Sequence, residues 1–72
     1  MNRAQVHAIV EPHVKSAVGH GAKWGLYREL TLDDADKKTM AAQHMGEVHG
    51  EEGMSRFILT ERKDGTHEFH WN

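Results

Sequence analysis

The strongest constraint on the fold lies at the C-terminal end, where two strand-like segments, 57–62 and 66–71, flank the turn Lys63-Asp64-Gly65. A two-residue turn would place apolar side chains on both faces of this hairpin. A three-residue loop with a left-handed glycine bulge gathers them on one face instead. Because a one-residue slip flips every side chain, the amphipathic register should win. It pairs Phe57 with Trp71 and Leu59 with Phe69, and it turns Ile58, Thr60, Glu68 and His70 to the other face.

The length of the chain allows one small core. A domain of 72 residues buries only about 60% of its unfolded surface and is marginally stable. The chain contains no cysteine, so no disulfide supports that core, and the composition suits a reducing compartment. We therefore expect one domain over residues 1–72, located in the cytoplasm, with no signal peptide and no segment able to span a bilayer.

The N-terminal segment has the periodicity of a helix. Asn2 is a candidate N-cap, and Gln5 completes a pattern like a capping box. Gly19 and Gly21 are candidate stops. The apolar positions recur at helical spacing and are Val6, Ile9, Val10, Val14, Ala17 and Val18.

Pro12 leaves two alternatives for this segment. Inside a helix, proline removes one hydrogen bond and clashes with the carbonyl of Ala8, which predicts a single kinked helix. Alternatively the helix begins near Pro12, because proline favours the first turn, and residues 1–10 form a loosely held arm.

The middle of the chain predicts a strand, a second helix and a loop. Over residues 22–31, alternation puts Trp24, Leu26 and Leu30 on one face, together with Arg28, and Lys23, Tyr27 and Glu29 on the other. The acidic stretch 32–36 opens a second helix, capped by Asp33 or Thr31, which ends between Gly46 and Gly50. Residues 46–53, rich in glycine and glutamate, predict a flexible loop.

These elements predict an α+β fold of order α-β-α-β-β, with a three-stranded, mainly antiparallel sheet and helices on one face. The expected core comprises Val14, Val18, Trp24, Leu26, Leu30, Ala42, Met45, Phe57, Leu59, Phe69 and Trp71.

Seven histidines make the chain histidine-rich but give no metal or catalytic signature. His44 and His49 are five residues apart, whereas a zincin helix needs a separation of four. The serines lie outside any nucleophile motif. We therefore expect a non-enzymatic protein with no cofactor and no metal site. Net charge moves from −2 with neutral histidines towards positive as imidazoles titrate near pH ~6.5, so binding or self-association should depend on pH.

Protein binding is the expected function, through apolar anchors ahead of Pro12 that are rimmed by polar groups. The candidate protein-binding residues are Val6, His7, Ile9, Val10, Glu11 and His13. The alternative is a small nucleic-acid-binding module in which basic residues alternate with an aromatic one, through Lys23, Tyr27 and Arg28. Lysine and arginine together number 9 against 11 acids, so composition alone does not favour nucleic acid.

In small size, lack of cysteine, lack of a catalytic motif and mixed polar surface, the chain resembles small phage-encoded inhibitors of bacterial RNA polymerase. This resemblance implies a regulator that occupies a surface of a larger host complex such as the polymerase and so controls transcription. We expect such a binder to be monomeric when free, without contact to a membrane.

Overall fold

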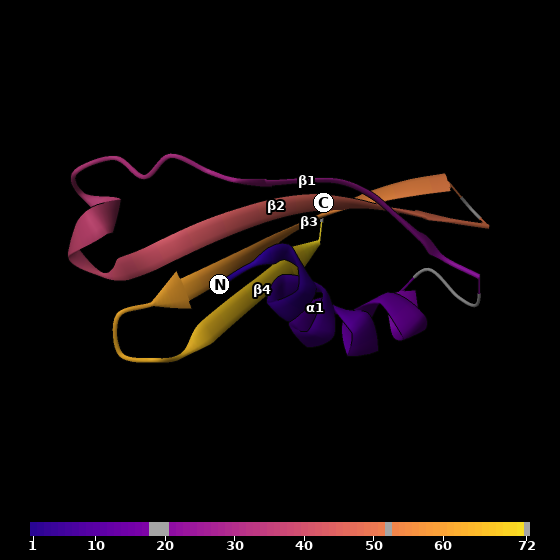
Figure 1. Ribbon diagram of the computed structural model, residues 1–72, viewed down its shortest axis with the longest axis horizontal. Coiled ribbons are helices and arrows are strands. Elements are labelled where there is room, and N and C mark those ends of the chain that lie inside the picture. The colour runs from indigo at the N-terminus through magenta and orange to yellow at the C-terminus, as the bar shows by residue number, and fades with distance from the viewer. Residues whose placement is uncertain (18–20, 52, 72) are drawn as a thin grey trace.

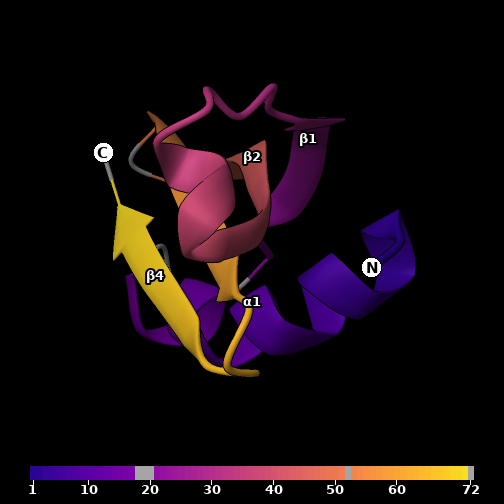
Figure 2. The same ribbon diagram turned by 90° about the vertical axis from the view of Figure 1, so that its left-hand side faces the viewer.

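A computed structural model describes residues 1–17, 21–51 and 53–71. Four strands form one antiparallel sheet in the order β1-β2-β3-β4, and α1 lies across one face of it (Figures 1 and 2). The elements are α1 (Arg3–Ala17), β1 (Lys23–Glu29), the short 3-10 helix η1 (Asp36–Lys38), β2 (Met40–Gly50), β3 (Gly53–Arg62) and β4 (His67–Trp71).

The predicted fold class is wrong in its sheet and in its second helix. Instead of a three-stranded sheet with two helices, the described residues form four strands and one α-helix. Asp33 accepts a hydrogen bond of 2.8 Å from the amide of Asp36, but the N-cap residue of η1 is Ala35, without a side-chain cap hydrogen bond. The turn ends after η1, and the residues expected to continue the helix form β2. Central strand pairing on both sides, with β1 and β3, overrides the helix propensity of this segment.

Within the predicted flexible loop 46–53, residues 46–50 and 53 are likewise strand. Gly46 to Gly50 belong to β2, and β3 begins at Gly53. Gly53 has φ +121°, a left-handed conformation that favours glycine. The glycines that predicted a loop therefore have two other roles. Gly50 and Gly53 pair where β2 is connected to β3, and Gly46 lies inside the sheet.

The predicted start of α1 is confirmed. The Asn2 amide donates to Oε1 of Gln5 at 2.7 Å, and the Gln5 amide donates to Oδ1 of Asn2 at 2.9 Å, which is a reciprocal cap. Of the two alternatives left open by Pro12, the structure has one helix with the proline inside it. Residues 3–10 are therefore part of the helix and not a loosely held arm.

The core lies between α1 and the sheet. Three helix valines spaced four residues apart face the buried side chains of β2 and β3. The buried cluster is Val6, Val10, Val14, Val48, Phe57 and Leu59, with Ile9, Ala22, Trp24, Tyr27, Phe69 and Trp71 packed against it.

The C-terminal hairpin has the predicted register. Phe57 pairs with Trp71 and Leu59 with Phe69, and their side chains share the face that α1 covers. Gly65 has φ +88°, the left-handed conformation that the three-residue loop requires.

A β-bulge changes which residues of β1 reach the core. Register shifts between Trp24 and Tyr27, so Tyr27 turns inward while Leu26 is 56% exposed and Arg28 lies opposite Met45 on the other face. The predicted face shared by Trp24, Leu26 and Leu30 is thus interrupted, because a bulge inserts one residue into the alternation.

Of the other predicted core residues, Val14, Ala42, Phe57 and Leu59 are buried, and Trp24, Phe69 and Trp71 pack against the cluster. Leu30 and Met45 are only half-buried, and Val18 lies outside the described residues.

Candidate functional site

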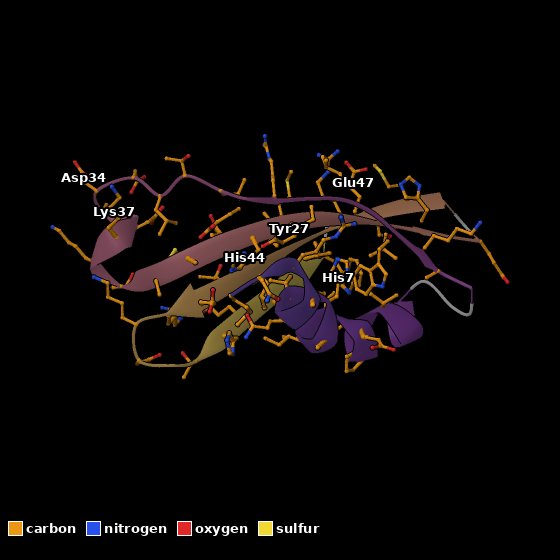
Figure 3. The ribbon with its side chains drawn as sticks, in the orientation of Figure 1. His7, Tyr27, Asp34, Lys37, His44 and Glu47 are labelled. Atoms are coloured by element: carbon orange, nitrogen blue, oxygen red, sulfur yellow. The ribbon has the colours of Figure 1, made fainter. Side chains whose placement is uncertain are left out.

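The sheet has two different faces. We call the surface opposite α1 the open face; among the described residues, the one α-helix lies on the other side. In Figure 3, Tyr27 and His44 lie towards α1, which carries His7, whereas Glu47 projects away from the helix. Strand register assigns to the open face Lys23, Leu26, Arg28, Gln43, Met45, Glu47, His49, Met54, Arg56, Ile58, Thr60, Arg62, Glu68 and His70.

A row of side chains with an apolar centre crosses the open face. It has one residue on each of the four successive strands, namely Arg28, Met45, Ile58 and His70. The two central residues are half-buried and the two outer ones are exposed. Aliphatic side chains at the centre with charged or polar groups at the margin have the anatomy of a protein-binding surface.

The two acidic side chains of the open face, Glu47 and Glu68, are each paired with basic side chains. Glu47, whose side chain is 17% exposed, lies 4.0 Å from Arg56 and 3.9 Å from His49. Glu68 pairs with Arg62 and lies 3.8 Å from His70. These contacts lower the pKa of Glu68, chiefly through the hydrogen bond and positive charge of Arg62.

Two cations of the open face remain for a partner. Lys23 and Arg28 are exposed, and neither has an acidic partner among the described residues. The chain as a whole is acidic, at −2 with neutral histidines, yet this face combines four lysine and arginine side chains with two paired acids. Its uncompensated charge is therefore positive.

A polar chain crosses the other face beside α1. The hydroxyl of Tyr27 is 3.0 Å from Nδ1 of His44, and Nε2 of His44 is 2.7 Å from Oε2 of Glu61. A carboxylate only accepts hydrogen bonds, so Nε2–H donates to Glu61; in the neutral imidazole, Nδ1 then accepts from the tyrosine hydroxyl. One imidazole thereby connects β1, β2 and β3.

Burial decides what this polar chain does. The His44 side chain is 0% exposed, so an external substrate has no access to its ring. Burial, followed by the negative charges of Glu29 and Glu61, raises the pKa of Tyr27, which keeps its hydroxyl protonated. The arrangement satisfies buried polar atoms and holds the strands together; it is structural.

The six residues predicted to bind protein do not form one exposed surface. Val6 and Val10 are 0% exposed in the core, and Ile9 packs against it. The side chains left at the surface of α1 are His7, Glu11 and His13. A partner that contacted the two valines would have to displace α1 from the sheet.

His7 and His13 each stack on an aromatic side chain that packs against the core. The ring of His7 stacks on Trp24 with centroids 4.0 Å apart, and that of His13 stacks on Phe69 at 4.2 Å. The first contact lies at β1 and the second at β4. Burial, and then the charge of Arg3, lower the pKa of His7. Sequence periodicity gives no sign of this stacking, because both aromatic partners come from distant strands.

The residues of the nucleic-acid alternative lie on both faces. Lys23 and Arg28 are on the open face, whereas Tyr27 points towards α1 and bonds to His44. All the aromatic residues of the chain, Trp24, Tyr27, Phe57, Phe69 and Trp71, belong to the core or pack against it. The open face thus lacks the aromatic platform on which unpaired bases stack.

The histidine pair considered for metal does not converge. His44 and His49 are in β2, not in a helix, and they face opposite sides of the sheet. In the described part of the chain, no group of three or more metal-ligating side chains is placed to hold an ion.

No protein-family model, curated protein or solved structure matches the chain. Within residues 1–17, 21–51 and 53–71, no helix has the length and apolar character to cross a membrane.

Proposed function

We propose that this chain is a non-enzymatic regulator whose open face binds an acidic surface of a larger protein complex. The observation that carries the proposal is the row of Arg28, Met45, Ile58 and His70 across the four strands. Burial of the two aliphatic side chains would supply affinity. Arg28 and Lys23 would steer the approach of an acidic partner and fix its register.

This surface replaces the N-terminal segment as the proposed binding site. Using Val10 as an anchor would require the core to open, whereas Met45 and Ile58 are reached without any change of fold. The resemblance to phage inhibitors makes bacterial RNA polymerase the first partner to test.

The test compares two charge reversals by biolayer interferometry against purified bacterial RNA polymerase. Arg28→Glu changes the open face, and Lys37→Glu makes the same change of charge in η1, at one end of the molecule (Figure 3). We expect Arg28→Glu to weaken binding by about tenfold, equivalent to ~1.4 kcal/mol, while Lys37→Glu binds like wild type. Circular dichroism and melting temperature check that both variants fold.

Equal binding by both variants would contradict the open face as the site, and absence of polymerase binding would reject this partner. Tight binding to DNA or RNA that falls steeply as salt rises would support the nucleic-acid alternative instead. That alternative has less support because the open face has basic side chains but no stacking aromatic residue.

A further inference from the structure

The two edges of the sheet differ in how well they are protected against another strand. At β1, register shifts between Trp24 and Tyr27, and the guanidinium of Arg3 donates to the Gly25 carbonyl at 3.2 Å. A bulged edge with an occupied carbonyl is a poor template for pairing. β4 has an unbroken register with β3 and contains no proline, glycine or lysine.

Backbone groups of β4 point outward at alternate residues. The Arg62 amide donates to the Thr66 carbonyl at 2.9 Å, which marks 62 and 66 as a hydrogen-bonded pair. In an antiparallel ladder such pairs alternate with non-hydrogen-bonded ones. Glu68 and His70 therefore direct their backbone groups to β3. The residues whose amide and carbonyl face the uncovered edge are His67, Phe69 and Trp71.

We propose that β4 pairs antiparallel with β4 of a second copy of this chain, around a two-fold axis at Phe69. The sheets of the two copies become one continuous sheet. Phe69 then bonds to Phe69 of the partner, and His67 bonds to the partner's Trp71. All three outward-facing residues obtain backbone partners.

Side-chain charge selects the same register. With Phe69 on the axis, Glu68 lies opposite the partner's His70, in the non-hydrogen-bonded positions where side chains approach most closely. An imidazole N–H donates to a carboxylate in either of its protonation states. Moving the axis by one residue would place Glu68 opposite Glu68 of the partner, or His70 opposite its own copy, and would also lose backbone bonds.

The side chains that meet the second copy are accessible. His67, Glu68 and His70 are exposed, and within the described residues β4 pairs with β3 alone. The fit is self-complementary, as a two-fold interface demands, which favours a second copy over an unrelated strand. This dimer differs from the free monomer expected from sequence. It shares His70 with the open face, but it does not rest on the proposed function, because the backbone groups that join the two copies lie at the β4 edge.

The test is sedimentation velocity of the full chain over a range of concentrations, with two complementary variants. In a dimer of His70→Glu, Glu68 of each copy lies opposite the glutamate introduced at position 70 of the other copy. Glu68→Arg places arginine opposite the partner's histidine. Each variant alone should dimerise at least tenfold more weakly than wild type. An equimolar mixture should recover a heterodimer, since Glu68 then meets His70, and the arginine introduced at 68 meets the glutamate introduced at 70.

His49→Glu is the matched control, because it alters an exposed histidine of the open face in a central strand, and its dimerisation should equal that of wild type. Melting temperatures establish that all variants fold. A wild-type chain that stays monomeric at every concentration, variants that dimerise as wild type does, or a mixture that remains monomeric would each overturn the proposal.

Discussion

Replacing Gly46 with alanine should destabilise the protein because this glycine makes room for the ring of Phe57. A Cβ at Gly46 would lie 2.3 Å from Cζ and 2.4 Å from Cε1 of Phe57, far inside van der Waals contact. The ring is fully buried and cannot swing aside. Edge contacts enclose it from Trp24 and Trp71, with centroids 6.1 and 6.3 Å away.

The size of the effect follows from competing contributions. Overpacking a core costs about 1–3 kcal/mol, and the enclosed ring places Gly46→Ala near the upper end. The lower backbone entropy of alanine in the unfolded chain returns roughly 0.5–1 kcal/mol. A net loss of about 2 kcal/mol is large for a domain of this size, whose total stability is about 4–11 kcal/mol, and corresponds to a drop in Tm of roughly 8–16 °C.

Urea unfolding followed by circular dichroism measures this loss, and Gly25→Ala is the matched control. There the new Cβ would meet Nε2 of His49 at 2.9 Å, but that imidazole is 54% exposed and can rotate away. Adding Phe57→Leu to Gly46→Ala should cost less than the sum of the two single changes. Wild-type stability of Gly46→Ala, or an equal loss in Gly25→Ala, would refute the argument.

The remaining predictions concern buried and titrating polar groups. Tyr27→Phe removes the donor to Nδ1 of the buried His44, and urea unfolding should show a loss of about 1–3 kcal/mol. The pKa of His7 is lowered by burial and by Arg3, so its contribution to stability is complete above the ordinary histidine pKa of ~6.5 and is lost as pH falls below it; His7→Gln should flatten this part of a stability–pH profile. Hydrogen bonds from the Thr66 hydroxyl and amide lower the pKa of Asp64, so its contribution is present above the ordinary carboxyl pKa and is lost as pH falls through the lowered value; thermal melts should show less acid sensitivity in Asp64→Asn.

The C-terminal hairpin was predictable because its information is local. The turn residues and both strands lie within residues 57–71, and only one register brings Phe57, Leu59, Phe69 and Trp71 to one face. The cap formed by Asn2 and Gln5 was predictable for the same reason, since its two hydrogen bonds span three residues.

β2 was not predictable from local pattern. Its buried residues are Ala42, His44, Gly46 and Val48, an alternation in which two positions are small and one is polar. Strand alternation is recognised by large apolar side chains at every second position, and here their space is taken by a neighbour. Gly46 is small because the Phe57 ring occupies that volume, so the reason for the residue lies in another strand.

The candidate site depended on the same long-range information. The bulge at β1 put Leu26 and Arg28 on the open face, and the conversion of a predicted helix into β2 added Met45 beside them. A helix at this position would have directed Met45 into the core, as the sequence periodicity suggested. The predicted binding valines were instead the apolar stripe that α1 needs in order to bury one face.

The histidine content of the chain does not reveal which histidine has a structural role. Of the six histidines in the described residues, only His44 is buried. Both of its hydrogen-bond partners, Tyr27 and Glu61, lie 17 residues away, one on each side. Nothing in the immediate sequence of His44 distinguishes it from His49, which is exposed. The register of β2 with its two neighbouring strands makes one of them a structural connection and leaves the other on the face proposed to bind a partner.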